Sequence, residues 1–236
     1  MVLKILRILA SVLFVVCIPI VLVTSNGRGV INTPRLYEYG YDKYNVADAT
    51  GLEKAELMHI AEELIIYFNS PGELSVADDF NGREVTHLAD VKNLIGLFSW
   101  IQEACLMYVI GYIFMGYYFL KRKWWPMLAK RLIWSSALTL GIFAALGIAL
   151  AVNFDGLFTW FHEAGFSNTL WLMLPSDLLT KLYPQSFFFD VSLFVVIAVV
   201  IECVLMGGIS AGHLIYRKRK SVATVATGGG AGTTSV

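Results

Sequence analysis

Four long apolar segments constrain this chain more than any other feature of its sequence. They cover about residues 5–23, 94–120, 132–152 and 191–216. A helix needs roughly 20 residues to cross the hydrocarbon core of a bilayer, and each segment is close to or above that length. A backbone in lipid must satisfy its own hydrogen bonds, which favours helices. We therefore expect an all-α membrane protein with four transmembrane helices.

The composition agrees with this fold class and excludes several others. Apolar residues make up 57% of the chain and charged residues only 15%, whereas soluble domains carry about 25% charge. The formal net charge is zero, which argues against nucleic acid as a partner. Cys17, Cys105 and Cys203 all fall inside expected spans without a metal-ligand spacing. We interpret them as buried apolar residues and expect no metal and no cofactor.

Clusters of positive charge predict how the chain is oriented in the membrane. The basic side chains of segments 4–7, 121–131 and 217–220 have no acidic residue among them. By the positive-inside rule these three segments are cytoplasmic, and so are both termini. The loops at 24–93 and 153–190, in which acidic residues outnumber basic ones, then lie outside.

The expected organisation is one membrane domain over residues 1–219, followed by a disordered cytoplasmic tail over residues 220–236. The tail is rich in Ala, Thr, Gly and Ser and has no large apolar groups, which is typical of disorder. We expect the two outer loops to carry amphipathic or interfacial helices.

One such helix is predicted in the first outer loop. Thr50 and Glu53 have the spacing of a capping box, T-x-x-E. An apolar stripe then repeats at helical spacing through Leu57, Ile60, Ala61, Leu64 and Phe68. The stripe should pack on other outer segments or rest on the membrane surface.

Two of the four histidines are candidates for chemistry. His87 directly precedes the second span, with Asp90 about 60° further around the helix, close enough to orient the imidazole. His162 follows the third span on the same side of the membrane, within an aromatic loop. His59 on a solvated helix face and His213 at an inner helix end are interpreted as structural.

A pair of imidazoles at a lipid surface suggests acid/base chemistry on a lipid headgroup or an acyl ester. The sequence has no G-x-S-x-G elbow, no H-E-x-x-H pattern and no glycine-rich phosphate loop. Serine hydrolases, zinc proteases of that type and nucleotide-driven pumps are therefore disfavoured.

A longer pattern surrounds both histidines. It consists of Glu84-Val85-Thr86-His87-Leu88-x-Asp90-Val91-Lys92, Phe161-His162, Phe166-x-Asn168, Trp171, Asp177-Leu178-Leu179 and Pro184. With four spans and a long first outer loop, the chain resembles the lipoprotein intramolecular transacylase family of bacterial integral membrane proteins. The resemblance extends to about Arg219.

The resemblance implies an activity and a site. Members act on a lipoprotein whose N-terminal cysteine bears a diacylglyceryl group, and they move the sn-2 acyl chain to the α-amino group of that cysteine. The product is a lyso-form N-acyl lipoprotein. The implied catalytic residues are His87 and His162, the supporting ones Asp90, Glu84 and Lys92, and the substrate-binding ones Phe161, Phe166, Asn168 and Trp171.

The resemblance also implies a location and partners. The protein would be a multi-pass protein of the bacterial cytoplasmic membrane with its active site on the extracytoplasmic face. Its partners would be the diacylglyceryl lipoprotein and membrane lipid.

Two other functions stay open from the residues alone. A metal-dependent membrane hydrolase could use both histidines with Asp90 or Glu163, although catalytic zinc usually needs three protein ligands. A non-enzymatic membrane scaffold could instead use the outer helix to bind a partner.

Overall fold

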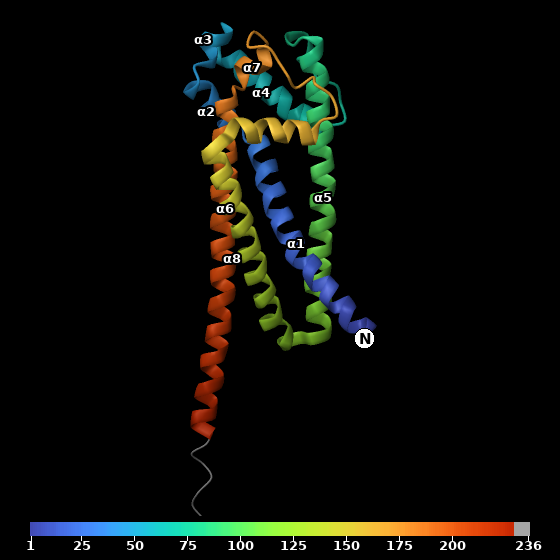
Figure 1. Ribbon diagram of the computed structural model, residues 1–236, viewed down its shortest axis with the longest axis vertical. Helices are drawn as coiled ribbons and strands as arrows, with labels where there is room; N and C mark the ends of the chain where they lie inside the picture. The colour runs from blue at the N-terminus through green and yellow to red at the C-terminus, as the bar shows by residue number, and fades with distance from the viewer. Residues whose placement is uncertain (229–236) are drawn as a thin grey trace, which may run out of the picture. The chain divides into compact units, whose positions relative to one another are not determined.

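The chain folds into helices joined by short connections (Figure 1). The structure is a computed structural model that describes the backbone of residues 1–228 and the side chains of residues 1–222. The elements are α1 (Val2–Ile31), α2 (Pro34–Lys43), α3 (Val46–Thr50), α4 (Lys54–Asn69), the 3₁₀ turn η1 (Ala77–Asp79), α5 (Gly82–Leu120), the 3₁₀ turn η2 (Lys121–Lys123), α6 (Trp124–Gly165), α7 (Leu178–Leu182) and α8 (Gln185–Gly228).

Three helical stretches of the described chain are long and apolar enough to cross a membrane. They are Val2–Ile31, the 84 residues of Gly82–Gly165, and Gln185–Val222. The second stretch contains two helices, α5 and α6, on either side of η2. Together with the all-helical described chain, these stretches confirm the expected class of helical membrane protein.

The chain groups into two compact units, and the long helices contribute to both. Of the described residues, unit 1 contains 1–21, 105–142 and 200–228, whereas unit 2 contains 22–104 and 143–199. The single domain expected over residues 1–219 stays a prediction. Helix α8 continues to Gly228 and so includes residues 220–228 of the expected tail. The disordered tail stays a prediction, and its remaining residues lie outside the described ones.

Within unit 1 the chain reverses direction at η2. Lys121 adopts φ +46°, a left-handed conformation that ends α5 because a helix cannot continue through it. The indole of Trp124 then packs back on α5, with its ring 5.3 Å from that of Tyr112. A methyl group at Gly116 would lie 2.3 Å from this indole, so only glycine permits the contact.

Helix α6 bends sharply at Asn153, as Figure 1 shows. The backbone there has φ −154° and ψ 76°, outside the helical region. The Asn153 side chain accepts a hydrogen bond from the Gly156 amide at 2.9 Å, so it caps the helical segment that follows. The bend coincides with the expected end of the third span at residue 152.

The shorter helices of unit 2 share one apolar core with the start of α5. The predicted stripe of α4 is confirmed at four positions, because Leu57, Ile60, Ala61 and Leu64 are at most 1% exposed. Phe68, its fifth member, is only partly buried. Full burial of such an aliphatic side chain contributes about 1.5–3 kcal/mol. The core also takes side chains from α2, α3, α5 and α7: Tyr37, Tyr41, Val46, Leu88 and Leu182.

The start of α4 differs from the expected capping box. Thr50 ends the short helix α3, and its hydroxyl donates to the carbonyl oxygen of Val46 at 2.7 Å. Glu53 is the N-cap residue of α4 and makes no side-chain cap bond. The T-x-x-E pattern therefore spans the boundary between two helices, and that prediction is wrong.

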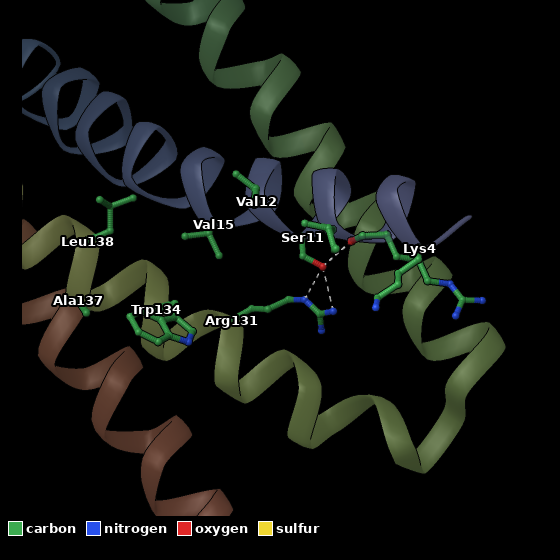
Figure 2. A pocket seen from close by; sticks show the side chains of 10 residues that line it. Lys4, Ser11, Val12, Val15, Arg131, Trp134, Ala137 and Leu138 are labelled. Carbon is green, nitrogen blue, oxygen red and sulfur yellow. Dashed lines mark hydrogen bonds between the residues drawn. The ribbon is translucent and has the colours of Figure 1, made fainter. Parts of the chain in front are cut away.

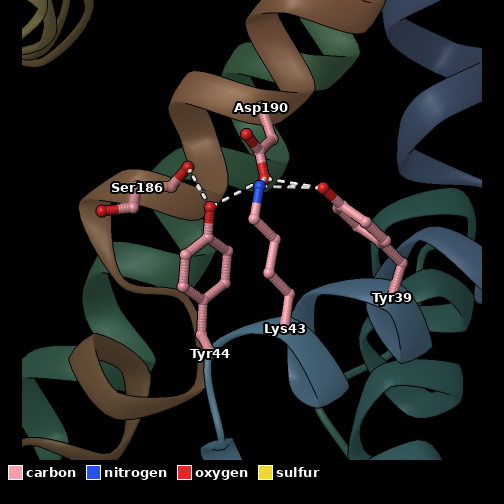
Figure 3. Close-up of polar contacts among 5 residues, drawn as sticks. All are labelled: Tyr39, Lys43, Tyr44, Ser186 and Asp190. Carbon is pink, nitrogen blue, oxygen red and sulfur yellow. Dashed lines mark hydrogen bonds and ion pairs between the residues drawn. The ribbon is translucent and has the colours of Figure 1, made fainter.

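A polar cluster joins α2 to the start of α8 (Figure 3). The carboxylate of Asp190 is buried and accepts hydrogen bonds from Lys43 at 2.6 Å, Tyr44 at 2.7 Å and Tyr39 at 3.0 Å. Beside this cluster, Gly40 allows the ring of Phe187 to approach, since a methyl group there would lie 2.5 Å from Cδ2. These contacts anchor the outer helices to a membrane-capable helix.

Candidate active site

His87 lies in the second turn of α5, directly after a first turn that a capping box holds in place. Asn81 Oδ1 accepts from the amides of Arg83 at 3.0 Å and Glu84 at 3.1 Å, while Glu84 Oε2 accepts from the Asn81 amide at 2.7 Å. This reciprocal pair satisfies amides that a helix start leaves without partners. Asn81 and Gly82 thus begin the helix.

Glu84 also joins α5 to α7. Its side chain is 1% exposed, and Oε1 accepts from the Leu179 amide at 2.6 Å. A carboxylate that receives amide bonds on both oxygens is held in one orientation. Glu84 thus holds the start of α5 against α7; the supporting role expected for it stays a prediction.

His162 lies on the segment of α6 that follows the bend at Asn153. Its Nδ1 is 2.7 Å from the carbonyl oxygen of Phe158, one turn earlier. A carbonyl oxygen only accepts hydrogen bonds, so Nδ1 carries the proton in this contact. In the neutral ring, Nε2 then has the free lone pair.

The two predicted histidines come together. Their ring centroids are 6.2 Å apart with an angle of 26° between the planes. The ring of Phe166 contacts both, with centroids 5.1 Å from His87 and 5.7 Å from His162. The ring centroid of Trp171 lies 5.0 Å from that of His162. A histidine pair within an aromatic enclosure is the central feature of this site.

Burial keeps both histidines neutral near pH 7. His87 is 7% exposed and precedes the expected span at 94–120. Burial and then the proximity of His162 lower the pKa of His87 to about 4, against the opposing effect of the Asp90 carboxylate. Burial also lowers the pKa of His162, and the hydrogen bond to Phe158 opposes the shift. Neutral imidazoles can accept protons, as a general base must.

Asp90 does not orient His87 by a hydrogen bond as expected. Its Oδ2 accepts from Asn168 Nδ2 at 2.8 Å, and His87 Nδ1 is buried without a hydrogen-bond partner among the described residues. The Asn168 side chain also accepts from the Leu170 amide at 2.9 Å. Asp90 and Asn168 therefore fasten the second outer loop to α5, beside the histidines.

Lys92 and Phe161 take different places from the other predicted site residues. Lys92 Nζ donates to the carbonyl oxygen of Gly72 at 2.6 Å and lies 3.9 Å from the Tyr67 ring centroid, so it holds α5 against the end of α4. Phe161 meets His162 edge-on at 5.5 Å and is 45% exposed. Lys92 therefore makes a structural contact between helices. Phe161 lies at the exposed edge of the aromatic rings around His162.

Sequence reasoning assigned no role to three residues that build the site. Phe158 supplies the carbonyl for His162, and its ring centroid lies 4.2 Å from the imidazole. Arg83 donates from Nη1 to the carbonyl oxygen of Leu172 at 2.6 Å, and Asp177 accepts from Asn81 Nδ2 at 3.2 Å. The i, i+4 spacing of Phe158 and His162 was a signal that could have found the first.

The metal-dependent alternative requires a third ligand near the two histidines. Among the described residues, no group of three or more His, Cys, Asp or Glu side chains is arranged to hold a metal ion. The expectation of a reaction without metal or cofactor stays a prediction.

Known proteins resemble this chain over most of its length. The model of the family "Lipoprotein intramolecular transacylase Lit" matches residues 12–188. The in meso structure of the membrane-integral lipoprotein intramolecular transacylase of Bacillus cereus has 25% identity and a TM-score of 0.80, covering 92% of this chain and 99% of that one. A structure of the same protein with one histidine replaced by arginine matches with 25% identity and a TM-score of 0.75, covering 92% and 96%. An uncharacterized protein of Aquifex aeolicus is 29% identical over 201 residues, which cover 81% of this chain and 88% of that protein.

The helical fold, the apolar helices and these matches define a membrane-integral acyltransferase that processes lipoproteins. The chain belongs to the lipoprotein intramolecular transacylase family.

Proposed function

We propose that the chain moves the sn-2 acyl chain of a diacylglyceryl lipoprotein onto the α-amino group of the same lipoprotein's N-terminal cysteine. The product is an N-acyl lipoprotein with a free sn-2 hydroxyl. Family membership supports the class of reaction. The observation that carries the proposal is the pair of neutral, stacked imidazoles of His87 and His162 in an aromatic enclosure.

His162 is the general base in this proposal. Its Nδ1 proton is bound to the carbonyl oxygen of Phe158, which leaves the Nε2 lone pair available to the substrate. The α-amino group has a pKa near 8, so it loses its first proton to bulk water or a base before it can attack. When the free amine attacks the ester carbonyl, Nε2 takes the second proton from nitrogen.

His87 stabilises the oxyanion of the tetrahedral intermediate in this proposal. A neutral imidazole has one N–H donor, which can bond the oxyanion of the tetrahedral intermediate. The intermediate collapses as the bond between the carbonyl carbon and the sn-2 oxygen breaks. The proton held by His162 passes to that oxygen, so a C–N bond replaces a C–O bond with no net change in protons.

Positioning accounts for most of the rate in this scheme. Amine and ester belong to one molecule, and well-oriented intramolecular reactions reach effective molarities of roughly 10⁵–10⁸ M. Acid/base help adds about 10²–10⁴-fold. Phe158, Phe161, Phe166 and Trp171 surround His162, and we propose that these rings seat the acyl chains while Asn168 keeps the loop in place.

We further propose four membrane crossings, at about residues 5–23, 94–120, 132–152 and 191–216, as a single domain. The break between α5 and α6 at η2 supports two crossings within the long helical stretch. Basic segments without acids support cytoplasmic termini. Both histidines would then act at the outer face of the bacterial cytoplasmic membrane.

Expression in a bacterium that lacks its own lipoprotein N-acyltransferase tests this function. Mass spectrometry of lipoprotein N-termini should find one acyl chain on the amine and one on the glyceryl group. The double variant His87→Ala/His162→Ala should leave the amine free. Triacylated lipoproteins, or release of fatty acid as the main product, would contradict the proposal.

A further inference from the structure

A second candidate site lies in unit 1, in a cavity of about 770 Å³ between α1 and α6 (Figure 2). Clefts that bind small molecules have volumes of about 300–1,000 Å³. One part of the lining is cationic, with Lys4, Arg7 and Arg131. The other part is apolar and includes Val12, Val15 and Leu138.

Arg131 is held in place at this cavity. Its Nε and Nη2 donate to the Ser11 hydroxyl at 3.1 and 3.0 Å, as drawn in Figure 2. The guanidinium carbon lies 5.5 Å from the Tyr112 ring centroid and 5.1 Å from that of Trp124. Guanidinium has five N–H donors, so two bonds to Ser11 leave donors for an anion. A preorganised guanidinium loses little entropy when it binds phosphate.

The segments that line the cavity contain no acidic residue that could neutralise its positive charge. Residues 1–21 and 105–142, which supply its whole lining, contain no Asp or Glu. Within the described chain, Lys4 and Arg7 make no ion pair. The site therefore favours a ligand with net negative charge.

The apolar side of the cavity favours a ligand that carries a hydrocarbon chain as well as an anion. Val12 is 54% exposed, Leu138 40% and the neighbouring Trp134 70%. A hydrocarbon chain would cover these side chains, and a free phosphate ion would not. A headgroup with its own cation would meet three cations, which disfavours zwitterionic lipids.

We propose that this cavity binds one anionic phospholipid, with its phosphate at Arg7 and Arg131 and an acyl chain along Val12, Val15 and Leu138. In the orientation proposed above, the lipid belongs to the cytoplasmic leaflet. The site is separate from the histidines in sequence and in chemistry, so it is not the substrate site of the transacylation.

Native mass spectrometry of the full-length protein tests the proposal. Delipidated protein in detergent is mixed with equal amounts of phosphatidylglycerol and phosphatidylcholine of the same acyl chains. We expect one phosphatidylglycerol adduct, favoured over phosphatidylcholine by roughly tenfold. The double variant Arg7→Gln/Arg131→Gln should bring the two adducts close to parity.

Two further variants separate this site from general surface charge and from misfolding. Leu138→Trp keeps every charge but fills the apolar side, so it should also lose the preferred adduct. Lys121→Gln/Lys123→Gln removes the same charge from η2 and should keep it. The proposal is overturned if wild type binds both lipids equally, if the η2 variant loses as much as the arginine variant, or if Leu138→Trp retains the adduct.

The same spectra test whether the site binds a phospholipid or a soluble phosphate compound. Millimolar glycerol 3-phosphate should not displace the phosphatidylglycerol adduct, because it cannot use the apolar side. Displacement would mean a site for soluble anions and would contradict the lipid assignment. These spectra contain no lipopeptide substrate, so they report lipid binding separately from the proposed transacylation.

Discussion

The imidazole rings of His87 and His162 lie 6.2 Å apart between centroids, stacked at 26°, although they come from different helices. His87 lies in the second turn of α5, and the carbonyl oxygen of Phe158 holds the ring of His162 at 2.7 Å. Neither ring carries a charge near pH 7, because burial lowers the pKa of both. This relationship makes proton transfer the chemistry that the site can perform, and the following predictions test it.

Alanine at either histidine should reduce turnover by about 10²–10⁴-fold, the usual contribution of acid/base catalysis. Turnover is measured with purified protein and a synthetic diacylglyceryl lipopeptide. His59→Ala and His213→Ala are the matched controls and should behave as wild type, because neither residue belongs to the site. Equal activity of His87→Ala and wild type would show that the assignment of that residue is wrong.

From about pH 8 down to just below pH 6.5, the pH dependence of kcat/KM should report only the ionisation of the substrate amine, because burial lowers the pKa of both histidines below the ordinary value. The substrate amine has a pKa near 8, so log kcat/KM should rise by one per pH unit below that value. The pKa of His87 is about 4, so this residue stays neutral above pH 5 and adds no slope there. An ordinary histidine would add a second unit of slope below about pH 6.5. Asp90→Asn should preserve the single slope, since the carboxylate raises the pKa of His87.

Much of this architecture follows from patterns that are local in sequence. The apolar stripe through Leu57, Ile60 and Leu64 is buried as its spacing predicts. The expected end of the third span at residue 152 coincides with the bend at Asn153. Such features depend on neighbouring residues of one helix, so periodicity and charge are sufficient to find them.

Contacts between distant segments were not predictable in the same way. The partner of Asp90 is Asn168, and helical spacing alone pointed to His87 because the second outer loop was not yet placed. The first outer loop contains two capping-box patterns, T-x-x-E at Thr50 and N-x-x-E at Asn81. Only the second forms, because Thr50 ends α3 and so does not begin a helix. Glu84 also accepts from the Leu179 amide, a bond that no local pattern contains.

Replacement of the buried acid in Glu84→Gln should destabilise the fold. The amide group offers one acceptor oxygen where the carboxylate gives two, so one backbone amide loses its partner at a cost of about 1–3 kcal/mol. The thermal midpoint in detergent should fall accordingly. Asp79→Asn, an exposed acid in the same segment, should leave the midpoint unchanged. A stable Glu84→Gln protein would contradict the role given to this contact.

Membrane orientation can be tested by cysteine accessibility in a background without native cysteines. Probes that replace Glu53 or Trp171 should react with an impermeant maleimide added outside intact cells, because both lie on expected outer loops. A probe at Lys123 in η2 should react only after the membrane is opened. Labelling of the Lys123 probe from outside would place both histidines on the wrong side.

The most direct test of the account follows the acyl chain itself. Purified protein is given an equal mixture of two diacylglyceryl lipopeptides of different sequence, one with isotopically heavy acyl chains and one with light chains. A histidine pair that transfers only protons cannot store an acyl group, so each N-acyl product should keep its own label and carry a free sn-2 hydroxyl. Products with exchanged labels in the mass spectrum would contradict the account and indicate a covalent acyl-enzyme or transfer between molecules.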